Sequence, residues 1–349
     1  MTIVRRFGKP DLFVTMTCNP KWEEIQENLY KEQDPSDRPD IIDRVFNLKI
    51  KALLRDVTNQ VFGFCIAWMY PVEFQLRGLP HIHLLITLAQ KDKLHDGEDV
   101  DKRGISAKIP NKNQDPQLYE LVKKHMIHGP CGILNPNSPC MEEITDKNNV
   151  KIKRCSKGYP KSFQEKTIVL ENGFTIYARP NDGNFVEVKI FDGKVYKLDN
   201  RWVVPHMPYL LKKFSCHINV EKVNSLSSVK YLHKYIHKGP DRTGVKLVEK
   251  IDFDEVKQFT DARFVSPTDA VWRILENPIC DRSHAIKTLP VHLSGEQIYY
   301  FEENMEEEEL RDKINRNTEL MAYFELNKND ELAKNKYYHE IPEFFVFGK

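Results

Sequence analysis

The sequence predicts an α+β fold, in which strands form hairpins and a long helix packs beside them. Residues 61–75 and 82–88 are two apolar, partly β-branched runs separated by a short turn, which is the pattern of a β-hairpin. Residues 12–17 alternate apolar and polar side chains, as a half-buried strand does. Asp40 can cap a helix that runs to about Asn59, because apolar residues recur there at roughly helical spacing.

The composition is that of a globular protein. Of the 349 residues, 40% are hydrophobic and 30% are charged, which allows one large domain or two smaller ones. No apolar run approaches the roughly 18 residues of a membrane-spanning helix, and the first residues lack the apolar core of a secretory signal. Seven cysteines, an odd number in a long chain, argue against an extracellular disulfide framework and favour a reducing compartment.

The second strand of the hairpin begins with two histidines. Residues two apart on a strand point to the same face, so His81 and His83 present two imidazoles side by side, which is half of a metal site. An odd-numbered loop places Gln75 opposite His81 and Glu73 opposite His83, and either side chain could supply a third, oxygen ligand. A slip of one residue in the register would turn both away. The competing interpretation is a pair of structural histidines at the start of a strand.

A Pro- and Gly-rich stretch at about 125–165 follows a polar loop at 91–113 and a short predicted helix at 117–126. It carries four soft or imidazole ligands with the spacing His-x2-Cys-x8-Cys-x14-Cys: His128, Cys131, Cys140 and Cys155. This set predicts a structural zinc site that holds a strand-poor insert. The spacing matches no standard zinc finger, so three ordinary thiols in a loop are the alternative.

The rest of the chain alternates short strands and helices. Residues 166–198 read as hairpins with turns at Asn172-Gly173 and Asp192-Gly193, and residues 215–221 alternate as a strand. Helices are predicted at 266–275 and 321–338.

A basic helix is predicted before Gly239-Pro240, which is a strong helix stop. Tyr231 and Tyr235 are four residues apart on it and therefore share one face. Lysines form a neighbouring row on this helix: Lys230, Lys234 and Lys238. An amphipathic helix with two buried core tyrosines is the competing interpretation, but few apolar residues accompany them.

The near-neutral total charge hides an uneven distribution. Residues 201–250 carry ten Lys or Arg against three Asp or Glu, whereas residues 301–349 carry seven against thirteen. The basic block predicts contact with a polyanion, through Lys230 and Lys238, with Arg77 beside the histidine strand. No phosphate-binding loop of the Gly-x4-Gly-Lys-Ser/Thr type occurs, so the sequence is not that of an NTPase.

Two imidazoles and one oxygen ligand form an open site that suits Mg²⁺ or Mn²⁺ as the working metal, although the imidazoles would bind Zn²⁺ or Ni²⁺ more tightly. Such a metal polarises a phosphate, and a tyrosine beside it can attack the phosphorus once its proton is lost. Lys234 is placed to favour the deprotonated tyrosine. We expect a single-stranded or locally melted DNA substrate, because duplex stacking hinders placing the phosphate at the metal.

Several short motifs together resemble the Rep nuclease domain of Helitron rolling-circle transposases. They are DLFVT at 11–15, NPKW at 19–22, QLRGLPHIH at 75–83, HGPCG at 128–132, KGYPK at 157–161, KYLHKYIHKG at 230–239, AVWRI at 270–274 and YHEIP at 338–342. The resemblance covers nearly the whole chain.

The resemblance implies the fold and chemistry of the HUH endonucleases, in which an antiparallel sheet flanked by helices carries the histidines and a helix carries the nucleophile. It implies His81 and His83 as metal ligands and Tyr231 and Tyr235 as nucleophiles. Cleavage would leave a 5′-phosphotyrosine and a free 3′-OH. The third ligand varies across that class, so Glu73 and Gln75 both remain candidates.

The expected organisation is a nuclease core over residues 1–245, interrupted by the insert at about 91–200, and a mostly helical extension over 246–349 packed on the core. The family's upstream residues and its helicase domain are missing from the sequence, so we expect a nuclease fragment or a truncated copy. Expected partners are single-stranded DNA or melted transposon ends and, in a full-length protein, the helicase domain; no membrane is expected. The resemblance also implies a nuclear location.

Two other functions compete with nicking and strand transfer. One is a domesticated or decayed copy that binds DNA without cutting it, although the candidate ligands and tyrosines are all intact. The other is a zinc-stabilised interaction module.

Overall fold

The computed structural model describes residues 2–74, 79–145, 151–189, 193–223, 265–293, 295–297, 306, 308–309, 311 and 317–348. The chain divides into two compact units, Met1–His284 and Ala285–Lys349, which are described separately. The boundaries predicted from the sequence, at residues 245 and 246, stay a prediction.

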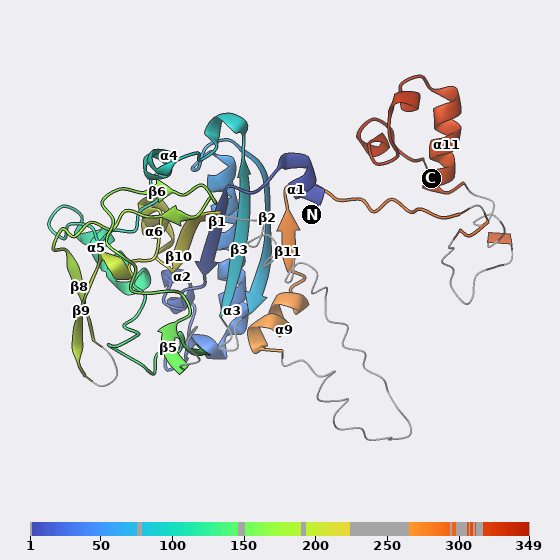
Figure 1. The fold of residues 1–349 in the computed structure, drawn as a ribbon. Helices are drawn as coiled ribbons and strands as arrows, with labels where there is room; N and C mark the ends of the chain where they lie inside the picture. The colour runs from blue at the N-terminus through green and yellow to red at the C-terminus, as the bar shows by residue number, and fades with distance from the viewer. Residues whose placement is uncertain are drawn as a thin grey trace. The chain divides into compact units, whose positions relative to one another are not determined.

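An antiparallel five-stranded sheet forms the centre of the first unit (Figure 1). Its order is β10-β1-β3-β2-β11, and its strands are β1 (Leu12–Thr17), β2 (Cys65–Phe74), β3 (Pro80–Leu88), β10 (Ile218–Lys222) and β11 (Cys280–Arg282). The α+β class and the central antiparallel sheet are therefore confirmed. Strand β3 lies in the middle, and all nine of its residues are buried.

One face of the sheet packs against helix α3 (Pro39–Thr58), which runs behind the strands in Figure 1. Alternate residues of β1 and β3 point to this face and are fully buried: Leu12, Val14, Met16, Ile82, Leu84 and Ile86. They meet the apolar stripe of α3, which includes Phe46, Ile50 and Leu53. Because successive side chains of a strand alternate between its two faces, the opposite face of β1 and β3 carries Thr15, His81 and His83.

The hairpin register differs from the one predicted. Glu73 pairs with His81 and Phe74 with Pro80, so the predicted pairing of Glu73 with His83 is wrong by two residues. Pro80 explains the difference, because the predicted pairing places it in the turn, whereas it is the first residue of β3. A proline is tolerated at the first position of a strand, where the missing N–H breaks no pairing hydrogen bond. Because the shift is even, Glu73 still shares a face with both histidines.

The insert between β3 and β10 carries short elements outside the main sheet. Its helices are η2 (Gln90–Asp92), α4 (Gly97–Lys102), α5 (Pro116–His125), η3 (Asn200–Trp202) and α6 (Pro208–Phe214). Its strands form three hairpins: β4 (Met141–Thr145) with β5 (Lys151–Cys155), β6 (Ile168–Val169) with β7 (Thr175–Ile176), and β8 (Phe185–Lys189) with β9 (Val195–Asp199).

The β4–β5 hairpin corrects the prediction that the Pro- and Gly-rich stretch is poor in strands. Its exposed cross-strand pairs are oppositely charged, with Glu142 opposite Arg154 and Glu143 opposite Lys153. Such pairs stabilise a hairpin but leave no apolar alternation for a sequence pattern to detect.

The remaining elements of the first unit are α1 (Thr2–Phe7), α2 (Glu23–Gln26), η1 (Pro35–Asp37) and α9 (Pro267–Ile274). In the second unit, the described elements are all helical: α11 (Glu319–Asn329), η4 (Ala333–Asn335) and η5 (Ile341–Glu343). None of the helices in the described part of the chain is long and apolar enough to cross a bilayer.

Truncating a side chain in the interface between β3 and α3 tests this core. We expect Leu84→Ala to lower the free energy of unfolding by about 2–5 kcal/mol, because Leu84 is fully buried and its loss leaves a cavity. Leu48→Ala on α3 is the matched control, since Leu48 is 62% exposed and should cost within about 0.5 kcal/mol. Urea unfolding measures both, and equal losses would contradict this packing.

Candidate metal centre and cleft

Glu73, His81 and His83 bring three ligand atoms together on the face of the sheet opposite α3. Glu73 Oε2 lies 3.1 Å from His81 Nε2 and 3.2 Å from His83 Nε2, and the two Nε2 atoms are 3.1 Å apart. The register across β2, β3 and β1 sets this arrangement, with His81 between Glu73 and Thr17 and His83 beside Thr15. We call these three residues the triad.

The spacing of the triad fits a metal ion. Neighbouring ligands of an octahedral ion with bonds of about 2.1 Å are about 3.0 Å apart, close to the three observed distances. Three ligands on one side leave the other positions for water or substrate. The triad is thus one of two described groups whose His, Cys or carboxylate atoms lie within 4.8 Å of one another.

Thr15 orients one of the histidines. Its Oγ1 lies 3.0 Å from His83 Nδ1, so an Nδ1–H that donates to this hydroxyl leaves the Nε2 lone pair free for a metal. The ring of His83 also stacks on Phe13, with 5.4 Å between ring centroids. Sequence reasoning missed Thr15, although the alternation of residues 12–17 already placed it on the polar face of that strand.

Glu73 is the negatively charged member of the triad. Burial acts to raise the pKa of its carboxyl, but contacts with His81 and His83 outweigh burial and lower the pKa to about 2. Glu73 is therefore ionised at neutral pH, which is the form that binds a divalent cation. Gln75, the other candidate for the third ligand, lies outside the described residues.

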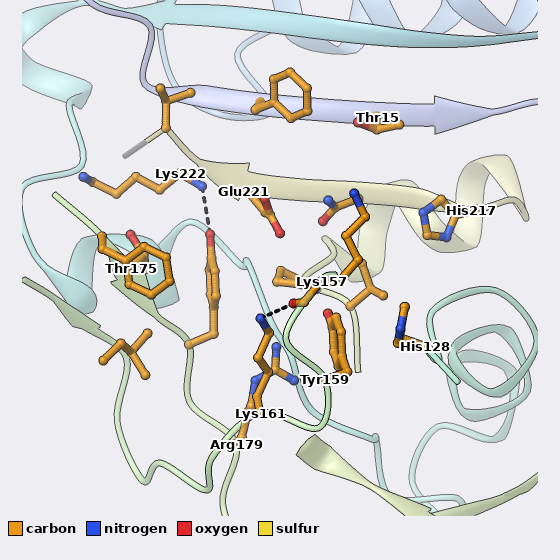
Figure 2. Close-up of a pocket in the computed structure, with 18 of the residues that line it drawn as sticks. Thr15, His128, Lys157, Tyr159, Lys161, Thr175, Arg179, His217, Glu221 and Lys222 are labelled. Atoms are coloured by element: carbon orange, nitrogen blue, oxygen red, sulfur yellow. Dashed lines mark hydrogen bonds between the residues drawn. The ribbon is translucent and has the colours of Figure 1, made fainter. Parts of the chain in front are cut away.

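The triad opens into a cleft of about 1110 Å³ between the sheet and the insert. The sheet wall includes the triad together with His217, Asn219 and Glu221 of the segment leading through β10. Asn219 Oδ1 is buried and has no hydrogen-bond partner in the described part of the chain. At one end, the backbone N–H of Lys222 donates to the hydroxyl of Tyr177 at 2.8 Å and ties β10 to the insert (Figure 2).

The insert wall faces β10 with basic and aromatic side chains, as Figure 2 shows for Lys157, Tyr159, Lys161 and Arg179. The ammonium of Lys161 lies 4.8 Å from the centre of the Tyr159 ring. Burial raises the pKa of Tyr159 to about 12, so this phenol stays protonated. Sequence reasoning noted the segment 157–161 only as a family motif, because nothing local shows that it lies over the sheet.

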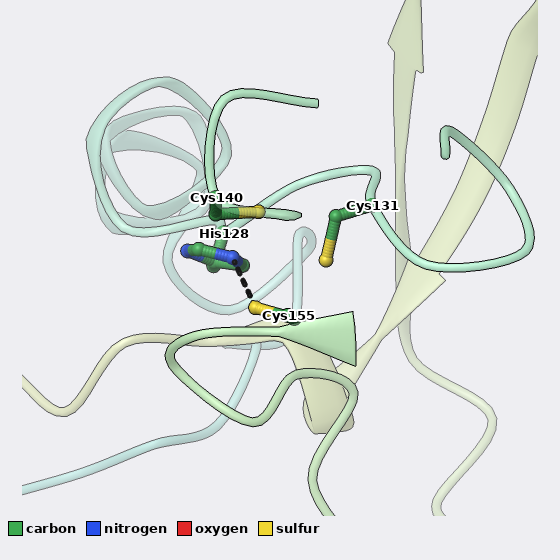
Figure 3. A group of neighbouring side chains, drawn as sticks. All are labelled: His128, Cys131, Cys140 and Cys155. Atoms are coloured by element: carbon green, nitrogen blue, oxygen red, sulfur yellow. Dashed lines mark hydrogen bonds between the residues drawn. The ribbon is translucent and has the colours of Figure 1, made fainter. Parts of the chain in front are cut away.

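The second group of candidate ligands lies in the insert (Figure 3). His128, Cys131, Cys140 and Cys155 offer four atoms within 4.8 Å of one another, and His128 Nε2 is 3.4 Å from Cys155 Sγ. The corners of a tetrahedron with Zn–S bonds of about 2.3 Å are about 3.8 Å apart, so a small inward shift would complete the site. We call these four residues the Cys/His cluster.

The protonation of the Cys/His cluster suits a metal. Burial, helped by Lys161 and Lys157, lowers the pKa of His128 to about 4, so its imidazole is neutral and can act as a ligand. Burial and the neighbouring Cys140 and Cys155 raise the pKa of the Cys131 thiol, a cost that a bound cation would relieve. The backbone at position 129 requires glycine for two reasons. A Cβ on Gly129 would lie 2.7 Å from the ring of Trp202, and its φ of +111° is one that residues with side chains rarely adopt.

The remaining predicted site residues lie outside the described residues. They are Arg77, Lys230, Tyr231, Lys234, Tyr235 and Lys238.

Residues 1–86 match the family described as "Helitron helicase-like domain at N-terminus". This segment includes β1, α3, β2 and most of β3, and with them the whole triad. No match was found among curated proteins. The Helitron resemblance is therefore confirmed over residues 1–86, and over the rest of the chain it stays a prediction.

The lowered pKa of Glu73 predicts a pH-dependent term in stability. A carboxyl whose pKa is below its usual value of 4.5 stabilises the folded state above that pH and loses this contribution as the pH falls through about 2. Without added divalent metal, we expect the unfolding free energy of Glu73→Gln to fall less between pH 4.5 and 2 than that of the wild type. Urea unfolding at several pH values measures this; Glu120→Gln, on the exposed side of α5, should behave like the wild type.

The Cys/His cluster predicts about one bound zinc per chain, measured by elemental analysis. We expect Cys131→Ser to lose this zinc and to lower the melting temperature by roughly 5–15 °C, because a structural metal contributes several kcal/mol to folding. His81→Ala is the control and should keep the zinc. Zinc-free wild-type protein would contradict the assignment.

Proposed function

Because residues 1–86 match the Helitron helicase-like family, we propose that the chain is a metal-dependent tyrosine endonuclease and strand transferase for single-stranded DNA. The observation that carries this proposal is the triad, whose three ligand atoms converge within about 3 Å of one another at the floor of a basic cleft. A metal ion that the protein holds from one side keeps open coordination positions for a substrate, as catalytic sites do, whereas the coordination of a structural ion is closed.

In this proposal, Glu73, His81 and His83 hold Mg²⁺ or Mn²⁺, which when bound polarises the scissile phosphate as a Lewis acid. Glu73 contributes the negative charge that a divalent ion requires. Thr15 keeps the imidazole of His83 in the tautomer that can bind through Nε2.

Tyr231 and Tyr235 are the proposed nucleophiles. The phenolate oxygen attacks the phosphorus, the bond to the 3′ oxygen breaks, and the departing 3′ oxygen takes up a proton. The products are a 5′-phosphotyrosine and a free 3′-OH. Lys234 favours the phenolate by its charge, since a free tyrosine has a pKa of about 10.

Chain connectivity makes this attack feasible. Val223 follows β10 and lines the cleft, and Tyr231 comes eight residues later. Eight residues span up to about 28 Å. Asn219 lies beside Thr15, which lies beside His83, so strand geometry puts Val223 about 16 Å from His83. The length of chain after Val223 therefore permits Tyr231 to reach the triad.

Two tyrosines would allow two transfers in succession, and the bond energy kept in the phosphotyrosine would drive rejoining to a second strand. Arg77, Lys230 and Lys238 would contact the DNA backbone. In a longer protein, a helicase domain would supply the single strand. The resemblance to transposases also leads us to propose a nuclear location.

Covalent capture of DNA tests the proposal. We expect the wild type with Mn²⁺ to form a protein–DNA adduct with an oligonucleotide labelled at its 3′ end, visible as a shifted band in a denaturing gel, because the 5′-phosphotyrosine joins the protein to the fragment on the 3′ side of the cut. Tyr231→Phe with Tyr235→Phe should abolish the adduct, and His81→Ala should reduce it at least about 100-fold, because the metal loses a ligand.

Tyr196→Phe is the matched control, because Tyr196 lies on β9 outside the cleft. A folded protein that binds DNA but forms no adduct with any divalent metal would instead support the decayed, DNA-binding copy. An adduct that survives the double tyrosine change would mean that another residue is the nucleophile.

A further inference from the structure

The insert wall of the cleft holds cationic side chains whose charges carboxylates do not balance. Arg179 is only 3% exposed, and its Nη1 donates to the carbonyl oxygens of Asn200 at 2.7 Å and Val203 at 2.6 Å. Lys161 is half-buried and donates to the carbonyl oxygen of Lys157 at 2.6 Å. Carbonyl groups orient these cations but carry no net charge to neutralise them.

Within the described part of the chain, neither Lys161 nor Arg179 forms an ion pair. The acidic side chain that acts on both is Glu221, on the opposite wall, and burial raises the pKa of its carboxyl despite the cations. Three cationic side chains, counting Lys157, therefore face one carboxyl group across the cleft. Burying cations without a balancing negative charge is costly even when carbonyl groups accept their hydrogen bonds, so the wall is suited to a bound anion.

The Cys/His cluster holds the segment that carries these lysines. Cys155 precedes Lys157 by two residues, and the backbone N–H of Ser156 donates to the carbonyl of Cys140 at 2.8 Å. The ring of His128 stacks on Tyr159 with 4.2 Å between centroids, and Tyr159 in turn lies against Lys161. His128, Cys140 and Cys155 thus each fix part of the wall, and His128 itself also lines the cleft.

We propose that Lys157, Lys161 and Arg179 form a second phosphate-binding site for the single strand, opposite the triad, and that the Cys/His cluster positions it. This inference rests on the proposed substrate, single-stranded DNA. One phosphate would lie at the triad and neighbouring phosphates against the insert wall, so the strand would be clamped from both sides before the tyrosine attacks.

The phosphate-binding role of the insert wall can be tested separately from DNA cleavage. The assay measures binding of a fluorescein-labelled single-stranded oligonucleotide without added Mg²⁺ or Mn²⁺. We expect Lys161→Ala to weaken binding about tenfold, and to reduce the slope of log K against log salt by about 0.7, because one phosphate contact is lost. Lys157→Ala, whose side chain is exposed, should act in the same direction without disturbing the fold. Lys161→Arg should restore most of the affinity.

Lys197→Ala is the matched control, because this exposed lysine of β9 lies in the same insert but does not line the cleft. It should bind DNA like the wild type. If Lys161→Ala and Lys157→Ala bind with wild-type affinity and salt slope, the phosphate site is overturned.

The link to the cluster has its own test. Cys140→Ser should lower zinc content and weaken DNA binding to about the level of Lys161→Ala, whereas the double variant should bind no more weakly than Lys161→Ala alone, because both changes act on one wall. Additive losses would show that the cluster does not act through the wall.

Failure of this inference and failure of the proposed function are distinguishable. If the wild type forms the covalent adduct but the lysine variants bind DNA normally, only the second phosphate-binding site is refuted. Lysine variants that lose binding, with a wild type that forms no adduct, leave the wall in place and overturn the nuclease.

Discussion

Strand β3 is paired along both edges and covered on both faces, and this double burial is the constraint on which the other features depend. Its Ile82, Leu84 and Ile86 side chains enter the α3 core, so the alternate side chains lie on the opposite face. On that face Leu85 packs beside Val4 of α1, whereas His81 and His83 line the cleft. Two imidazoles are tolerated there because Thr15 and Glu73, from the strands on either side, provide polar partners. The same pairing that stabilises the sheet therefore assembles the triad.

The insert depends on a different kind of stabilisation from the sheet. Its stretch from His128 to Cys155 contributes few apolar residues, so a metal held by the Cys/His cluster would replace part of the missing hydrophobic core. Because His128 stacks on Tyr159 and Tyr159 lies against Lys161, a metal bound there would also hold one wall of the cleft in place. Two metal sites would then have separate tasks: one in the chemistry, the other in the shape of the substrate site.

The proposed mechanism draws its metal ligands and its nucleophiles from different segments of the chain. Metal ligands on paired strands are held to within small displacements, as phosphoryl transfer requires. The proposed nucleophiles, Tyr231 and Tyr235, come between β10 and α9 in the sequence, after Val223, which lines the cleft.

Local patterns in the sequence were enough to identify the strands of the hairpin, helix α3, the shared face of His81 and His83, and the four residues of the Cys/His cluster. These depend on side-chain periodicity and on chemical type, which a single segment carries by itself. The tyrosine nucleophiles also came from local spacing and family resemblance, and they stay a prediction.

Only the tertiary structure decided the partners of those residues. It set the pairing of Glu73 with His81, because the position of Pro80 in the turn or in the strand depends on the neighbouring strand. It brought Thr15 into contact with His83, which is 68 residues away in the sequence. It also placed the Lys157–Lys161 segment opposite strands of the sheet that are distant from it in the sequence. Contacts between distant segments arise from the packing of the whole chain, and no local pattern contains them.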